Sequence, residues 1–93
     1  MRSWLFLLHP PYLAYERWWF AIEGQDRVCH GPFIDEKATG LAQLALFKRY
    51  EARARTLRGD VVRLTASRWL VTLPADVPCQ GQVFNSLPGA QAG

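Results

Sequence analysis

One long helical pattern occupies the middle of this 93-residue chain, and it limits what the remaining residues can form. Asp35 is a suitable N-cap, Glu36 favours the positive end of a helix dipole, and the next proline is Pro74. The pattern continues to about Thr56, and Gly59 follows a basic last turn as a stop signal. We therefore predict one helix over residues 36–56, and the rest of the fold depends on what packs against it.

The segments before and after this helix have the composition and alternation of β-strands. Residues 3–8 are a continuous apolar run that ends at a double proline, residues 16–23 alternate between two faces, and residues 27–33 follow a glycine-containing loop. After the helix, residues 61–65 and 68–73 are either two strands joined by a two-residue turn or one long bent strand. The predicted order is β-β-β-α-β-β.

This order predicts an α+β fold: an antiparallel sheet of four to five strands with one long helix packed on one face. Residues 1–75 would form a single domain and residues 76–93 an irregular C-terminal tail, because three prolines and three glycines fall in the last twenty residues. A hydrophobic fraction of 49% is sufficient for a core without help from metal or disulfide. One helix cannot cover such a sheet, so the other face must meet solvent or a partner.

Two adjacent tryptophans indicate which residues of their strand face the helix and which face the open side of the sheet. On a strand, Trp18 and Trp19 must point to opposite faces, with Phe20 and Ile22 on the side of Trp18. If Trp18 lies beneath the helix, Trp19 is on the open face beside Arg17. There it forms a hot spot for a partner, stacks on a base of single-stranded nucleic acid, or is covered by the N-terminal strand or the tail.

The helix carries more than one apolar side. On a helical wheel, Leu41, Leu44, Ala45 and Ala52 gather on one side, and Leu46 and Tyr50 gather on another, with Phe47 further round. Surplus aromatic residues and an incompletely covered sheet favour a protein–protein binding module that occupies a surface on a larger partner, with homodimer formation as a variant. The predicted contact residues are Arg17, Trp19, Phe47, Tyr50 and Arg53.

The second half of the helix is basic, which leaves a second hypothesis open. The segment LFKRYEARARTLRGD holds five of the eleven basic residues of the chain. These residues do not form a single stripe, and they suit the solvated face of a helix, a phosphate-binding patch or the surface for an acidic protein partner. As a nucleic-acid-binding surface, with Trp19 or Tyr50 stacking on bases, the segment would use Lys48, Arg49, Arg53, Arg55 and Arg58.

No motif points to catalysis, to a metal or to a cofactor. Cys29 and Cys79 are fifty residues apart, and neither they nor His9 and His30 have the paired spacing of a zinc site. We expect two free thiols, with a disulfide as the alternative. Phosphate-loop, dinucleotide and metalloprotease motifs are absent, and the acidic residues are scattered. We predict a protein that is not an enzyme, although an enzyme whose titratable groups come from distant positions stays open.

Charge and hydropathy predict a cytoplasmic protein with no membrane association. The net charge of +3 permits an acidic partner without requiring one. The first apolar run, Trp4 to Leu8, is too short for a secretion signal, and no stretch approaches the roughly 20 apolar residues of a membrane span.

No protein family is recognised from these motifs. In its size, its compactness and its lack of a catalytic motif, the chain resembles the small single-domain accessory proteins of phages and mobile elements, which include inhibitors of CRISPR effectors and of other host machines. That resemblance implies an inhibitor that acts by occupying a surface of its target.

Overall fold

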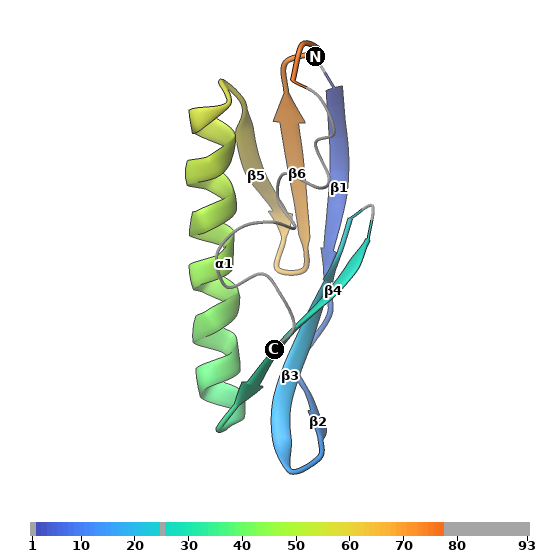
Figure 1. Ribbon diagram of the computed structural model, residues 1–93, viewed down its shortest axis with the longest axis vertical. Coiled ribbons are helices and arrows are strands. Elements are labelled where there is room, and N and C mark those ends of the chain that lie inside the picture. The colour runs from blue at the N-terminus through green and yellow to red at the C-terminus, as the bar shows by residue number, and fades with distance from the viewer. Residues whose placement is uncertain (1, 25, 78–93) are drawn as a thin grey trace.

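The computed structural model describes residues 2–24 and 26–77 and contains one helix and a six-stranded antiparallel sheet (Figure 1). The elements are β1 (Arg2–Leu8), β2 (Tyr12–Ala14), β3 (Arg17–Glu23), β4 (Arg27–Phe33), α1 (Glu36–Thr56), β5 (Asp60–Thr65) and β6 (Arg68–Leu73). The predicted α+β fold is confirmed, with the helix on one face of the sheet. Strand β2 was not predicted, because it has only three residues and directly follows the double proline.

The sheet is built around β3 and β1. Strand β4 pairs with one edge of β3, and both β1 and β2 pair with the other edge, through Leu8↔Ile22 and Tyr12↔Trp19. Because Pro10 and the following Pro11 have no N–H to donate, β1 and β2 form one interrupted strand along β3. On its opposite edge β1 pairs with β6, and β6 pairs with β5 through a two-residue turn, so residues 60–73 form two strands and not one bent strand.

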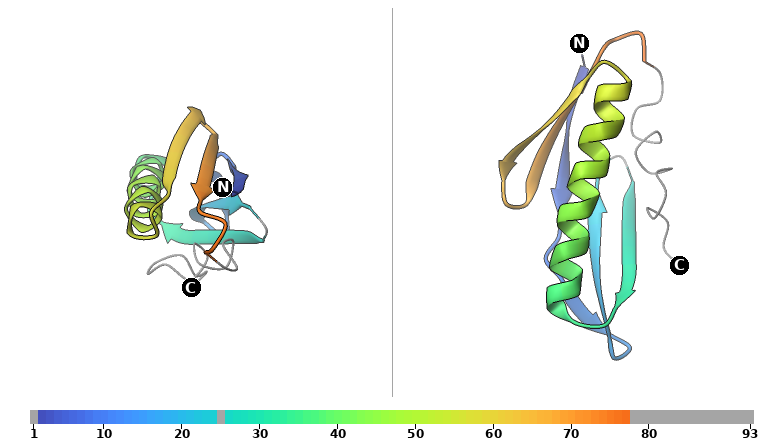
Figure 2. Two further views of the ribbon diagram at one scale, coloured as in Figure 1. Left: turned by 90° about the horizontal axis from the view of Figure 1, so that it is seen from above. Right: turned by 90° about the vertical axis from the view of Figure 1, so that its left-hand side faces the viewer.

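Helix α1 connects the two outer strands of the sheet, β4 and β5. In Figure 2 the sheet curves around the helix, with β5 and β6 on one side of its axis and β3 and β4 on the other. The predicted N-cap is confirmed, since Asp35 Oδ1 accepts a hydrogen bond of 2.7 Å from the N–H of Ala38. At the other end the N–H of Gly59 donates to the carbonyl of Ala54, and a side chain at Gly59 would collide with the carbonyl of Thr72. The glycine is therefore required by close approach of α1's end to β6.

The core lies between α1 and the face of the sheet that the helix covers. Leu46 and Tyr50 face this core, whereas Leu41 and Leu44 are 60% and 46% exposed. The side of the helix that carries the larger side chains is thus the buried one. Buried residues of α1 and of the sheet, together with Val77, form one core cluster: Phe6, Leu8, Phe20, Ile22, Leu46, Tyr50, Ala54, Val61, Trp69, Val71, Leu73 and Val77.

The packed part of the chain extends to Val77, which is buried in the core cluster. The guanidinium of Arg2 donates hydrogen bonds of 2.9 and 2.8 Å to the carbonyls of Ala75 and Val77, which holds this segment against β1. The remainder of the expected tail, residues 78–93, and with it Cys79, lies outside the described residues.

Tyr50 has no exposed surface, and its ring packs edge-on against Phe6 at 5.2 Å and Trp69 at 5.4 Å. Burial raises the pKa of the Tyr50 phenol far above its usual value of 10.0. Above about pH 10 an unfolded chain therefore loses this proton while the folded chain keeps it, and stability falls by about 1.4 kcal/mol per pH unit.

We expect Tyr50→Phe to remove this part of the alkaline destabilisation, because phenylalanine has no proton to lose. Urea unfolding at increasing pH measures it, as the difference in slope between wild type and variant above about pH 10. Tyr15→Phe is the matched control, because it removes the same hydroxyl group from a side chain that is 92% exposed. Equal slopes for wild type and Tyr50→Phe would contradict the prediction.

Candidate binding site

An aromatic hollow of about 240 Å³ lies on the sheet face that α1 leaves open, at the β2–β3 hairpin. It is lined by Tyr12 and Ala14 of β2, Tyr15 of the turn, Trp19 of β3 and Cys29 of β4. We call these five residues the aromatic hollow. Strand alternation places the group opposite the core, because Phe20 and His30, the neighbours of Trp19 and Cys29 along their strands, are buried.

The position of the Trp19 side chain is set from both sides of β3. Its Nε1–H donates a hydrogen bond of 2.9 Å to the carbonyl of Ala14 in β2. On the other side it passes over Gly31 of β4, where a Cβ atom would lie 2.7 Å from Cε3 of the indole. The indole therefore spans β3 from β2 to β4, with its only polar atom already bonded. What it offers to a partner is apolar ring surface.

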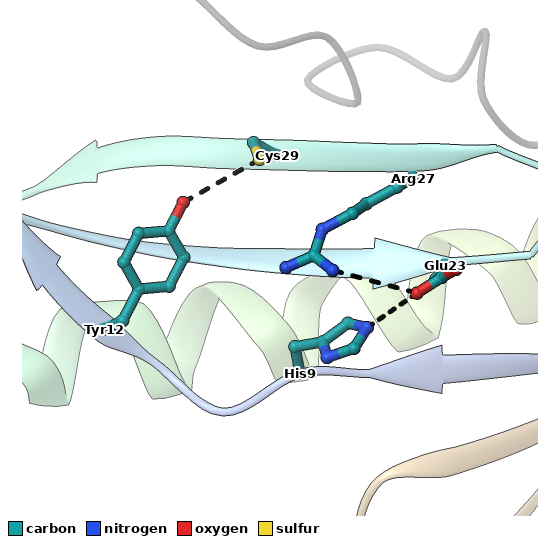
Figure 3. Close-up of polar contacts among 5 residues, drawn as sticks. All are labelled: His9, Tyr12, Glu23, Arg27 and Cys29. Carbon is teal, nitrogen blue, oxygen red and sulfur yellow. Dashed lines mark hydrogen bonds and ion pairs between the residues drawn. The ribbon is translucent and has the colours of Figure 1, made fainter.

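Tyr12 closes the hollow on the side nearest the middle of the sheet. Its hydroxyl donates to the Cys29 thiol across β3, at 3.8 Å, and both side chains stand in front of the sheet with α1 behind them (Figure 3). This hydrogen bond, with a smaller contribution from burial, raises the pKa of the Tyr12 phenol. The free thiol of Cys29 is half-buried. Tyr12 is consequently a neutral side chain at neutral pH, and its ring is the surface it presents.

A polar group borders the hollow on the same face. His9 Nε2 lies 3.0 Å from Oε1 of Glu23, and the Arg27 guanidinium lies 3.9 Å from the same oxygen (Figure 3). Glu23 thus lies between the His9 imidazole and the Arg27 guanidinium, and Arg27 acts on Tyr12 as a nearby positive charge.

The turn of the hairpin is strained. Ala14 pairs with Arg17, so Tyr15 and Glu16 are the two central residues, and their φ angles are +54° and +60°. Positive φ at both positions is the type I′ pattern that Asn-Gly adopts readily and that costs other L-residues about 1–2 kcal/mol each. The turn holds Tyr15 at the tip with 92% of its surface exposed. Strain of this kind in a native fold is a feature of binding and catalytic sites.

The structure brings together only part of the predicted contact set. Arg17 and Trp19 lie on the open face as expected, and the exposed Arg17 donates from its guanidinium to the carbonyl of Glu16. Tyr50 is a core residue, which corrects the prediction that its side chain is available at the surface. Phe47 is half-buried against Trp69 at 5.1 Å, with Arg63 4.7 Å above its ring. Arg53 is exposed on α1, on the side of the sheet away from the hollow.

The basic residues of the helix are spread over its exposed surface, and some are paired. Arg55 lies 3.4 Å from Glu51, and Arg58 lies 2.7 Å from Asp76, a contact that lowers the pKa of the Asp76 carboxyl. Trp19 is on the opposite side of the sheet and Tyr50 is buried, so neither ring lies beside the basic set. The predicted basic residues, all exposed, are Lys48, Arg49, Arg53, Arg55 and Arg58.

Tyr12 and Tyr15 are the residues that the sequence analysis missed at this site. A signal was present in the spacing. Two residues, Tyr15 and Glu16, separate the short run 12–14 after the double proline from the alternating residues 17–23, which is the spacing of a two-residue hairpin. It was hidden by the absence of the glycine or asparagine that marks such turns.

Two further hollows contact α1. They have volumes of about 160 and 370 Å³. The smaller is lined by Phe20, His30, Phe33, Ala42, Ala45, Leu46 and Arg49, and the larger by Leu8, His9, Pro10, Pro11, Gln43, Ala66 and Ser67. Neither gathers exposed aromatic rings as the aromatic hollow does. Within residues 2–24 and 26–77, no three His, Cys, Asp or Glu side chains are close enough to hold a metal ion.

Comparisons with protein-family models, with curated proteins and with solved structures found no match to this chain. In the part of the chain that the structure describes, α1 does not have the apolar character that a membrane-crossing helix requires. The assignment of function therefore depends on the chemistry of the site.

Proposed function

We propose that this protein is a small, non-enzymatic binding module that holds a larger partner protein at the aromatic hollow. The observation that carries the proposal is the strained turn that presents Tyr15 beside the rings of Tyr12 and Trp19. Tyrosine, tryptophan and arginine dominate the contact energy of protein interfaces, and Arg17 lies next to Trp19 on the same face. A turn that costs stability is expected to persist where the exposed residue makes a contact.

The chemistry of the hollow favours a partner that inserts an apolar side chain. Ring surface and the Ala14 methyl group form most of the lining, and the Nε1 of Trp19 is committed to the Ala14 carbonyl. The rim carries two arginines: Arg17 has no ion-pair partner among the described residues, and the exposed Arg27 is paired only with Glu23 there, at 3.9 Å. An apolar residue flanked by acidic residues would satisfy both parts of the site.

The mode of action that we propose is occupancy of a surface on the partner, as in the inhibitors of host machines that phages and mobile elements encode. Small size and a rigid, outward-facing aromatic group support that mode. We place the protein in the cytoplasm, where the half-buried thiol of Cys29 would remain reduced.

Nucleic-acid binding through the basic helix is the alternative, and the geometry favours it less. Its stacking residues and its basic residues lie on different sides of the sheet or in the core. A single strand would have to pass around the sheet to reach both Arg53 and Trp19.

We expect Tyr15→Ala to abolish capture of the partner while leaving the fold intact, because Tyr15 is 92% exposed and supports no core residue. The measurement is affinity capture from a bacterial lysate with the tagged protein, with and without nuclease, followed by mass spectrometry. Leu41→Ala is the matched control, since it removes a comparably apolar, 60% exposed side chain from the outer side of α1.

A captured protein that survives nuclease, persists with Leu41→Ala and is lost with Tyr15→Ala supports the proposal. Capture that disappears with nuclease and with Arg53→Ala plus Arg55→Ala would replace it with the nucleic-acid hypothesis. Capture that Tyr15→Ala does not change would show that the hollow is not the contact.

A further inference from the structure

A second apolar surface lies on the outer face of the other half of the sheet, across β1, β6 and β5. Outward-facing residues of the three strands form direct cross-strand rows. Leu5 pairs with Leu70 and Leu70 with Val62, so the middle row is entirely apolar. Leu5 and Val62 are 42% and 48% exposed, and Leu7 in the next row is 36% exposed. We call Leu5, Leu7, Val62 and Leu70 the leucine face.

The assignment of these residues to the outer face follows from their neighbours. Between the rows of the leucine face lie the inward rows Trp4–Val71–Val61 and Phe6–Trp69–Arg63. Phe6, Trp69, Val71 and Val61 are each at most 2% exposed and belong to the core. Alternation along a strand then places the residues between them on the side away from α1.

Opposite charges stand at the two ends of this face. The row at one end is Ser3, Thr72 and Asp60, and the row at the other end is Leu7, Arg68 and Thr65. Asp60 and Arg68 are exposed, and neither takes part in an ion pair within residues 2–24 and 26–77. The face is therefore acidic at one end, apolar in the middle and basic at the other end.

We propose that the leucine face binds a second copy of this chain, with the two sheets packed face to face about a twofold axis that runs across the strands. Such an axis reverses the strand direction between the copies and keeps the apolar middle row over itself. It places the row of Asp60 in each copy over the row of Arg68 in the other, twice, with the two charged residues on adjacent strands, β5 and β6. A face with one acidic and one basic end is complementary to its own reversed copy, and that self-complementarity identifies the occupant.

The dimensions of the face predict a weak dimer. Three strands spaced about 4.8 Å apart and six residues long span about 14 by 20 Å. That area is well below the roughly 800 Å² that each partner buries in a stable interface. The dimer should consequently form in the micromolar to millimolar range and dissociate on dilution.

The proposal is independent of the aromatic hollow, which belongs to β2, β3 and β4. The two halves of the sheet are turned relative to each other, so their outer faces point in different directions (Figure 2). Dimerisation would leave both hollows open and would present two of them on one particle, which strengthens binding to a partner that offers two sites.

The test is sedimentation velocity over a concentration series from micromolar to millimolar. We expect the mean mass to rise from monomer to dimer. Arg68→Asp and Asp60→Arg should each weaken the dimer about tenfold or more, because each places like charges in facing rows at both contacts. The double variant should restore the wild-type dissociation constant, since the pairs are re-formed in the reverse sense.

Lys37→Asp is the matched control, because it changes the net charge by the same amount as Arg68→Asp but lies exposed on α1. It should leave the dimer unchanged, and circular dichroism confirms that each variant is folded. A monomer at every concentration would overturn the proposal. A dimer that is insensitive to Arg68→Asp, or that the double variant fails to restore, would overturn it equally.

Discussion

Replacing Tyr15-Glu16 by Asn-Gly is expected to raise the free energy of unfolding by about 1–2 kcal/mol, less than the summed strain of the two positions because glycine loses more conformational entropy on folding, and at the same time to abolish partner capture. Asparagine and glycine adopt positive φ readily, so the strain at +54° and +60° is released. Capture is lost because the exposed ring at the tip of the hairpin is removed. A stabilising change that eliminates function is the signature of strain retained for a binding site.

The two single variants separate these effects. Glu16→Gly should stabilise the protein and preserve capture, because Tyr15 remains, whereas Tyr15→Asn should lose capture with a smaller gain in stability. Urea unfolding and affinity capture measure the two properties on the same samples. Unchanged stability of the double variant would mean that the turn is not strained, and retained capture would remove Tyr15 from the binding site.

Trp69→Ala is expected to reduce stability by about 3–5 kcal/mol, the largest loss for any single residue of the core. Trp69 has no exposed surface and packs edge-on against Phe47 and Tyr50, at 5.1 and 5.4 Å. A domain of this size has a total stability of roughly 5–10 kcal/mol, so the variant should be close to unfolding at room temperature. Circular dichroism with increasing urea measures the shift.

Trp69→Phe is the informative companion. The indole Nε1 of Trp69 is buried without a hydrogen-bond partner among residues 2–24 and 26–77, which costs about 1–3 kcal/mol. Phenylalanine leaves some empty volume but removes this penalty, so we expect a net loss of about 1 kcal/mol or less. A Phe variant as unstable as the Ala variant would mean that the N–H is satisfied and that ring volume accounts for the whole effect.

Local signals were sufficient to predict most of the fold. Asp35 with Glu36 located the start of α1, the alternation of residues 16–23 identified β3, and the inward direction of Phe20 and Ile22 followed from it. These signals act within a few residues, so the sequence carries them directly. The same alternation placed Trp19 on the open face.

The choice between the two apolar sides of α1 could not be made from the sequence. Leu41 and Leu44 are as hydrophobic as Leu46, and the wheel alone does not tell which side meets the sheet. The decision depends on volume: Tyr50 fills the space between Phe6 and Trp69, residues that are distant in the sequence. The aromatic hollow escaped prediction for a related reason, because Tyr12 reaches Cys29 only across an intervening strand.

The double proline between β1 and β2 divides the protein into a part that must be conserved to fold and a part that is free to diverge. Within residues 2–24 and 26–77, strand β2 pairs only with β3, and its exposed residues Tyr12 and Leu13 are not members of the core cluster. On the proposed function, substitutions at the tip of the hairpin would alter which partner is recognised while Phe20 and Ile22 maintain the core on the opposite face of β3. On that same proposal, related chains that bind different partners would differ most at that tip.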